Sequence, residues 1–212
     1  MARWLDFLFP PRVDEIALRD ISADDFLALV APRLVPETRP GTVTLLPFND
    51  TRVRSALHEA KYRGTDYAFK LLGLALAEYL NDFDDANYGL TKSVIIVPVP
   101  LGKERRKERG YNQVEEITRC ALRSLDDHFT LDVDLLLRVK ETPSQVSLER
   151  RRREENMRGA FRVAQDAARS VSPVHTYIVI DDVITTGATL QSAVDALSAA
   201  GAEYIIPLAL AH

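Results

Sequence analysis

The segment Tyr177–Leu190 constrains the fold of this 212-residue chain more than any other. Its apolar beginning predicts a buried strand over residues 174–180, and two adjacent carboxylates, Asp181 and Asp182, follow at once. A Thr-Thr-Gly-Ala-Thr turn comes next, and a helical pattern of apolar residues starts at Gly187. A strand, a polar turn and a helix in this order are typical of the repeating unit of parallel α/β sheets.

Strands and helices alternate along the rest of the chain. Short apolar runs predict further strands over residues 93–97, 135–139 and 204–210. Helical spacing of apolar residues predicts helices over 50–64, 66–80, 112–125 and 187–200, and Ser22 caps a short helix before them. Strands that alternate with helices form βαβ units. The expected fold class is therefore α/β, with a mainly parallel sheet flanked by helices.

Prolines divide the chain into two parts. The first 47 residues contain six of them and are restricted to short elements and turns: Pro10, Pro11, Pro32, Pro36, Pro40 and Pro47. The longer periodic segments begin only after this stretch. We therefore expect a small N-terminal appendage at residues 1–47 and the main domain at residues 48–212.

Composition excludes several classes of protein. A hydrophobic content of 46% and a charged content of 27% are typical of a folded globular chain and argue against disorder. The longest apolar stretches without charge, 93–102 and 204–212, are shorter than the ~20 residues of a membrane-spanning helix. Asp6 interrupts the apolar N-terminus, which is therefore not typical of a signal peptide. We expect a cytoplasmic protein without membrane insertion.

Cysteine and charge exclude further kinds of site. The one cysteine, Cys120, permits neither an intrachain disulfide nor a cysteine-based zinc site, and its amphipathic surroundings favour a buried thiol. The four histidines lack metal-ligand spacing. A net charge of −4 argues against a protein that binds nucleic acid over its whole surface. Basic residues nevertheless cluster at 103–109 and 150–153, which indicates either solvated helix faces or local anion binding.

The turn at Thr185–Thr189 is suited to a phosphate. It would present consecutive backbone N–H groups and three hydroxyls at a helix N-terminus, and Gly187 would let the backbone approach the ligand closely. Asp181 and Asp182 would repel that phosphate, so we expect them to face sugar hydroxyls or Mg²⁺. In a purely structural interpretation the acids end a strand and one threonine caps the helix. A cap needs only one such residue, which favours the binding site.

This segment resembles the 5-phosphoribosyl-1-pyrophosphate (PRPP) binding signature of the type I phosphoribosyltransferases. Within that superfamily the chain is similar to the ComF family, which includes GntX-like proteins. Two further blocks and one short segment extend the resemblance over residues 49–212: Pro98-Val-Pro-Leu101 with Arg105 and Arg109-Gly-Tyr-Asn-Gln113, then Thr142, Gln145, Leu148, Arg153, Asn156 and Phe161, and finally Lys61-Tyr-Arg-Gly64.

The resemblance implies a type I phosphoribosyltransferase fold and roles for these residues. Asp181 and Asp182 would hold the ribose hydroxyls, directly or through Mg²⁺, and Lys103 or Arg105 would offset the charge of the leaving pyrophosphate. The 5-phosphate would lie on Thr185, Thr186, Gly187, Ala188 and Thr189, and the pyrophosphate loop would be Pro100, Leu101, Gly102 and Lys103. A lid over 141–157 would close on the reacting carbon, with Asn112, Gln145, Arg152 and Arg153 as lid or acceptor residues.

Asn112, Gln113 and Gln145 have two interpretations. They either contact an acceptor base or cap the helix near Asn112 and support the lid.

The chain departs from the family in one respect. Relatives commonly begin with a four-cysteine zinc module, whereas this chain has Val13 and Asp14 where a cysteine is expected, and no cysteine before Cys120. We therefore expect no zinc, with the first 47 residues as a metal-free remnant held by apolar contacts. The cofactor implied by the acids and the resemblance is Mg²⁺ alone.

Three functions are consistent with these residues. The first is a phosphoribosyltransferase that uses PRPP and an unidentified acceptor. The second is a sensor of PRPP or a related sugar phosphate without turnover. The third, implied by the family's name, is an accessory protein of competence and DNA uptake that binds single-stranded DNA through its basic segments and contacts other competence proteins. Related enzymes are often dimers, which makes a homodimer a further expectation.

Overall fold

The computed structural model describes Leu18, residues 21–36, Thr38, and residues 41–87, 93–140, 157–165 and 171–212. Within these ranges the helices are α3 (Ala23–Leu27), α4 (Thr51–Tyr62), α5 (Asp66–Asn87), α6 (Lys103–Arg109), α7 (Gln113–Leu122) and α9 (Ala188–Ala199). The strands are β1 (Arg33–Val35), β2 (Thr42–Leu46), β3 (Val94–Pro98), β4 (Phe129–Leu131), β5 (Leu136–Arg138), β6 (Phe161–Val163), β7 (Thr176–Val183) and β8 (Tyr204–Ala211).

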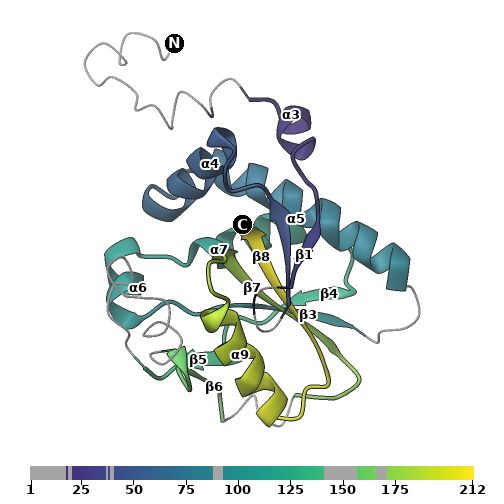
Figure 1. Cartoon of the computed structure of the whole chain (residues 1–212), viewed down its shortest axis with the longest axis vertical. Coiled ribbons are helices and arrows are strands. Elements are labelled where there is room, and N and C mark those ends of the chain that lie inside the picture. Colours follow the sequence, from purple (N-terminus) through teal and green to yellow (C-terminus); the bar gives the residue numbers. More distant parts are fainter. Residues whose placement is uncertain are drawn as a thin grey trace.

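Six of these strands form one sheet, in the order β1-β2-β8-β7-β3-β4. β1 pairs antiparallel with β2, and all the other pairs are parallel. This confirms the expected α/β fold with a mainly parallel sheet. Its longest strands, β7 and β8, pair side by side in the middle of the sheet (Figure 1).

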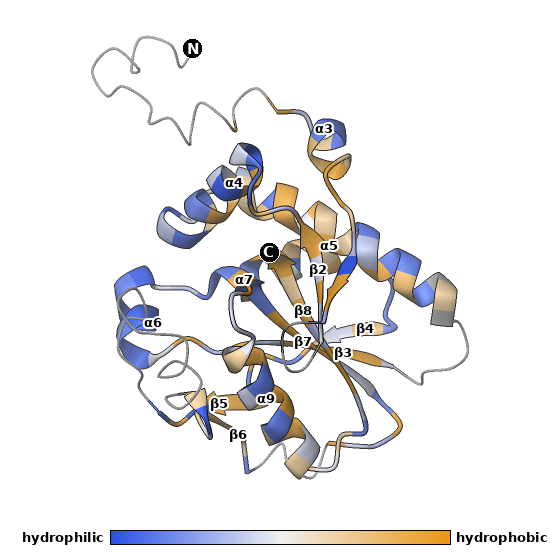
Figure 2. Ribbon diagram, viewed as in Figure 1, coloured by the Kyte–Doolittle hydropathy of each residue, from blue (hydrophilic) through white to orange (hydrophobic). Residues whose placement is uncertain are grey.

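Helices cover both faces of this sheet because successive side chains of a strand point to opposite sides. In β7, Ile178 and Ile180 belong to the hydrophobic cluster with α3, α4, α5 and α7. The alternate residues Tyr177 and Val179 belong to a second cluster with α9, β5 and β6. Figure 1 shows α5 and α7 on one side of the sheet and α9 on the other, and Figure 2 shows that these helices carry apolar residues.

Local sequence explains where the helices start. The Ser22 side chain accepts a hydrogen bond from the Asp25 amide, which confirms the predicted cap, and the Asp50 side chain caps α4 by accepting one from the Arg52 amide. The helix predicted over 66–80 extends to Asn87. The strands predicted at 93–97, 174–180 and 204–210 correspond to β3, β7 and β8.

The main sheet includes residues that the sequence analysis assigns to the appendage. β2 lies before the expected boundary at residue 47, yet it pairs in parallel with β8, and its Leu45 and Leu46 are buried. β1 then pairs with β2 at the edge of the sheet. β1 and β2 therefore belong to the main sheet, because short strands near prolines can still pair at the edge of a sheet or next to it.

The strand predicted over residues 135–139 corresponds to the shorter β5, which pairs with β6 in a separate two-stranded antiparallel sheet. This small sheet contributes Leu136 and Phe161 to the cluster around α9. Residues 103–109 form a helix, α6, where the sequence analysis has only a basic segment. No helix in the described ranges combines the length and the apolar character that a membrane span requires.

Candidate functional site

A cavity of about 960 Å³ lies at the carboxyl ends of the parallel strands. The residues that follow β3 and β7, among them Pro100 and Thr185, line it. From β3 the chain passes through α6 and α7 to β4 on one side, and from β7 it passes through α9 to β8 on the other. Such a reversal between neighbouring strands opens a crevice for ligands in α/β sheets.

The predicted phosphate turn forms one end of this cavity. All its residues, Thr185 to Thr189, line the cavity, and Gly187 adopts a left-handed backbone (φ 76°) as the N-cap of α9. Residues with a side chain rarely adopt this conformation, which explains the glycine. The N–H groups of a first helical turn lack intrahelical partners, so this turn can donate to an anion.

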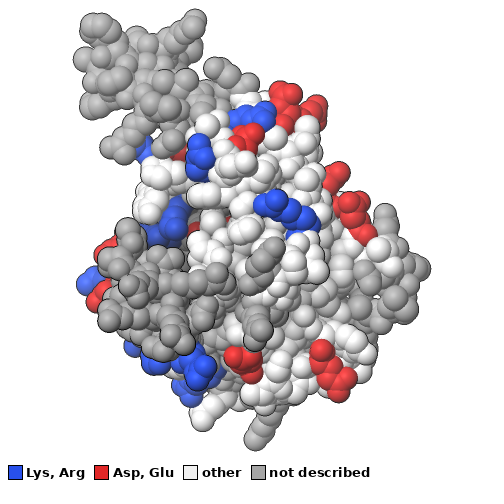
Figure 3. Space-filling view, viewed as in Figure 1, with Lys and Arg blue, Asp and Glu red and all other residues white. Residues whose placement is uncertain are grey.

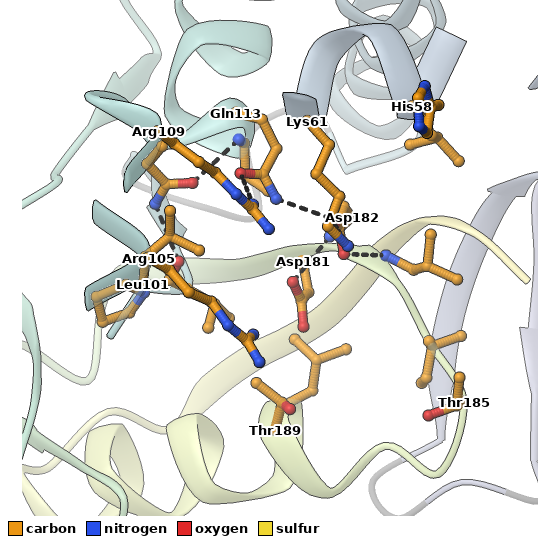
Figure 4. Close-up of a pocket in the computed structure, with 18 of the residues that line it drawn as sticks. His58, Lys61, Leu101, Arg105, Arg109, Gln113, Asp181, Asp182, Thr185 and Thr189 are labelled. Carbon is orange, nitrogen blue, oxygen red and sulfur yellow. Dashed lines mark hydrogen bonds and ion pairs between the residues drawn. The ribbon is translucent and has the colours of Figure 1, made fainter. Parts of the chain in front are cut away.

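Asp182 is held by three donors from three elements. Its Oδ1 accepts a hydrogen bond from the Val183 amide (2.7 Å). Its Oδ2 accepts one from Gln113 Nε2 (2.8 Å) and lies 3.5 Å from Lys61 Nζ. These contacts fix the carboxylate at the centre of the cavity between α4, α7 and β7 (Figure 4).

Asp181 has a different environment. Its Oδ1 accepts a hydrogen bond from the Asp182 amide (2.9 Å). Burial at the cavity floor and then the negative charge of Asp182 raise the pKa of Asp181 to about 7. A bound cation or hydroxyl donors would stabilise the ionised form of Asp181, as expected of an acid in a ligand-binding site.

Cationic side chains form a further wall of the cavity, the cationic wall. They come from α4, α6 and β5 and comprise Arg54, Lys61, Arg105, Arg109 and Arg138. Among the residues that line the cavity, the acidic ones are Glu108, Asp181 and Asp182, so cations outnumber acids. In Figure 3 basic side chains are more frequent on the side of α6, and acidic ones on the opposite side. The cavity therefore suits a ligand with several negative charges.

Comparison with known proteins supports this interpretation. The phosphoribosyl transferase domain family matches residues 128–212, which contain the phosphate turn and both acids. Competence protein F of Haemophilus influenzae is 36% identical over 110 residues, which cover 52% of this chain and 46% of that protein. DNA utilization protein YhgH of Escherichia coli is 32% identical over 147 residues, or 69% and 61% of the two chains. Competence protein ComFC of Bacillus subtilis is 33% identical over 102 residues, or 48% and 37%.

The chain belongs to the ComF family of phosphoribosyltransferase-like proteins. It spans 46% and 61% of the length of the first two relatives.

Part of the pyrophosphate loop expected of a ComF protein lines the cavity. Pro100 and Leu101 of this loop do so, and so does Arg105, which follows the loop. Gly102 is instead the buried N-cap of α6, and Lys103 is exposed at the first position of that helix, so neither belongs to the cavity wall. Arg105 is therefore better placed than Lys103 to meet a pyrophosphate.

Asn112 has a structural role in this ComF domain. Its side chain accepts a hydrogen bond from the Val114 amide as the N-cap of α7 and donates one to the Val99 carbonyl (3.0 Å). Only 4% of it is exposed. These contacts match the interpretation of Asn112 as a cap. The other expected lid residues, Gln145, Arg152 and Arg153, lie outside the described residues.

Arg138, His58 and Tyr62 are among the cavity residues that were not singled out for the site from the sequence. Arg138 reaches the cavity from β5, and its guanidinium lies 5.6 Å from the centre of the Phe161 ring. His58 and Tyr62 line the α4 wall with ring centres 4.8 Å apart. The signal that could have found them is helical spacing, since Lys61 and Tyr62 lie three and four positions after His58.

The donor set fits Mg²⁺. This ion prefers oxygen ligands and is usually bound by one or two carboxylates together with substrate phosphates. No three His, Cys, Asp or Glu side chains in the described ranges gather in a group able to hold a metal. Asp181 and Asp182 would therefore share the ion with oxygens of the substrate.

Proposed function

We propose that this chain binds PRPP, or a closely related sugar phosphate, together with Mg²⁺, and transfers the phosphoribosyl group to an acceptor with release of pyrophosphate. One observation carries the proposal: β7 and α9 place two carboxylates and a phosphate-binding turn in one cavity that also has a cationic wall. That combination matches a ligand with a phosphate at one end, a diol in the middle and a pyrophosphate at the other end.

Each part of the cavity then has one task. The amides and hydroxyls of Thr185–Thr189 bind the 5-phosphate. Asp181 and Asp182 accept hydrogen bonds from the ribose hydroxyls. Arg105 and Arg109 face the pyrophosphate. When bound, Mg²⁺ supplies positive charge beside the sugar and the pyrophosphate.

The reaction is a displacement at C1 of the ribose. The bond from C1 to the pyrophosphate oxygen breaks, its electron pair leaves with pyrophosphate, and an electron pair of the acceptor forms the new bond to C1. Positive charge develops on the sugar, and Asp181 and Asp182 beside it stabilise that charge. The contribution of the protein is therefore mainly positioning and electrostatic stabilisation.

Two measurements test this function. Calorimetry with PRPP and Mg²⁺ should give saturable heat for the unmodified chain and for Asp134→Asn, an exposed aspartate outside the cavity. It should give at least about tenfold weaker binding for Asp182→Asn, which loses a charged acceptor. Absence of binding to the unmodified chain would contradict the proposal.

Release of pyrophosphate separates an enzyme from a sensor. The unmodified chain, supplied with PRPP and a panel of candidate acceptors, should release pyrophosphate with one of them. Binding without release under any acceptor would favour a sensor of the sugar phosphate that uses the same cavity.

A second candidate function rests on the names of the relatives and on the basic helix α6. The chain would act in competence or DNA utilization by binding single-stranded DNA. Arg106, on α6, already donates a hydrogen bond to Glu115 (3.1 Å), which leaves less of its charge for DNA. This function predicts that single-stranded DNA binding weakens steeply as salt is added. Substitution of Arg106, Arg151 and Arg152 should weaken it further, whereas Asp181→Asn should leave it unchanged. Absence of DNA binding at low salt would exclude it.

A further inference from the structure

Gln113 joins two parts of the cavity that the proposed function uses for different ends of the ligand. Its Oε1 accepts a hydrogen bond from Arg109 Nη1 (2.9 Å), and its Nε2 donates one to Asp182 Oδ2 (2.8 Å). Only 3% of Gln113 is exposed. Figure 4 shows the amide between the two charged groups.

The chemistry of these groups fixes the orientation of the amide. A guanidinium only donates hydrogen bonds, and an ionised carboxylate only accepts them. The amide oxygen of Gln113 must therefore face Arg109, and its nitrogen must face Asp182. A glutamate would turn an acceptor toward Asp182, and a methionine of similar length would bond to neither group.

Arg109 depends on such contacts for its position. It lies on α6, none of whose residues is buried, so apolar packing does not hold this helix in place. Its guanidinium lies 5.5 Å from the centre of the Tyr62 ring and donates to Gln113. Gln113, by contrast, is the first residue of α7, a helix packed into the core through Val114 and Ile117.

We propose that Gln113 is a positioning residue that couples Arg109 to Asp182. Arg109 holds the amide in the one orientation that donates to Asp182, and the amide in turn directs the Asp182 carboxylate toward the sugar. This inference rests on the proposed function. Gln113 then links the pyrophosphate end of the cavity to its ribose end. A substitution at Arg109 should therefore alter ribose binding through Gln113.

A double-mutant cycle tests this link, with ribose 5-phosphate as the probe because it has no pyrophosphate. In the unmodified chain, both Arg109→Met and Gln113→Met should weaken ribose 5-phosphate binding, Gln113→Met by about tenfold, as is typical for a lost hydrogen bond to a charged group. When Gln113 is already methionine, Arg109→Met should have a much smaller effect. Arg105→Met removes the same charge from the same wall and should combine additively with Gln113→Met.

Two further variants complete the experiment. Gln191→Met removes a similar glutamine–aspartate hydrogen bond (to Asp195, 2.7 Å) outside the cavity and should leave the affinity unchanged. Gln113→Glu keeps the shape of the side chain and should weaken ribose 5-phosphate binding by about tenfold or more, a result that tests the inference even if the methionine variant fails to fold.

The outcomes distinguish the two proposals. If the unmodified chain binds neither ribose 5-phosphate nor magnesium pyrophosphate, the proposed function fails. If it binds them but the effects of Arg109→Met and Gln113→Met are additive, or Gln113→Glu binds normally, the link through Gln113 is wrong.

Discussion

The two walls of the cavity are built in different ways. The phosphate turn leads into α9, which packs against the sheet through buried residues such as Leu190 and Leu197. The cationic wall includes α6, which has no buried residue and is attached by hydrogen bonds from Arg106 to Glu115 and from Arg109 to Gln113. Figure 2 shows the same contrast, since α6 is hydrophilic and α9 has an apolar side. Changes at the α9 wall should therefore affect stability, and changes at α6 should affect ligand binding.

The largest expected effect is on the stability contributed by α9. Leu197→Ala should lower the free energy of unfolding by about 2–5 kcal/mol, because it leaves a cavity at a fully buried position. Leu34→Ala, at a leucine that is 63% exposed, should change it by less than about 0.5 kcal/mol. Urea denaturation measures both, and similar losses would show that the packing of α9 contributes no more to stability than an exposed leucine does.

The buried carboxylate of Asp181 should lower the free energy of unfolding at neutral pH. Its pKa is raised from 3.8 in the unfolded chain to about 7, so ionisation disfavours the folded state, and stability without divalent cations should fall as pH rises from about 4 to 7. Asp181→Asn should remove this fall and increase the free energy of unfolding above pH 7 by about 1–4 kcal/mol. Asp134→Asn is the exposed control. A pH dependence that is unchanged in Asp181→Asn would show that burial does not disfavour this charge.

The core support of α7 can be tested at Gly73 on α5. A Cβ there would lie 2.7 Å from Cys120 Cβ and 3.1 Å from the Ile117 carbonyl oxygen, so Gly73→Ala should cost about 1–3 kcal/mol. Gly41→Ala is the matched control, since its nearest atom is the flexible end of Leu34 at 3.4 Å. Equal melting temperatures of the two variants would mean that α5 and α7 can move apart without loss of stability.

The smallest effect on stability is expected for the contact that attaches α6 to Glu115 of α7. Burial alone would raise the pKa of Glu115, but hydrogen bonds from Arg119 and Arg106 outweigh it and lower the pKa. Glu115→Gln should change the free energy of unfolding by less than about 1 kcal/mol and yet weaken magnesium pyrophosphate binding several-fold, because α6 loses an attachment. Arg119→Gln keeps the bond from Arg106 and should bind pyrophosphate normally. If both variants bind equally well, α6 is held in place by other contacts.

How much the sequence predicted depends on the distance along the chain between interacting residues. The phosphate turn and the two acids were predictable because Asp181 to Thr189 are consecutive and have a recognisable order. The bond from Gln113 to Asp182 joins residues 69 positions apart, and no local pattern indicates it. Lys61 reaches the same carboxylate from α4, at a still larger separation.

Apart from β2, the elements that sequence analysis missed lack periodic apolar residues. The sequence of α6, Lys-Glu-Arg-Arg-Lys-Glu-Arg, has none, so no apolar pattern indicates a helix. β1, β4 and β6 have three residues each, too few for an alternation to be recognised. β5 was predicted as a strand, but its sheet could not be, because pairing with β6 depends on residues more than twenty positions later.

The central claim is that the turn at Thr185–Thr189 binds the 5-phosphate of PRPP while the neighbouring acids face the ribose. A crystal of the full chain soaked with PRPP and MgCl₂ tests it most directly. The account predicts electron density for a phosphate on the backbone amides of that turn, with the ribose hydroxyls next to Asp181 and Asp182. A fully accessible cavity without such density, or with the ribose turned away from both acids, would contradict it.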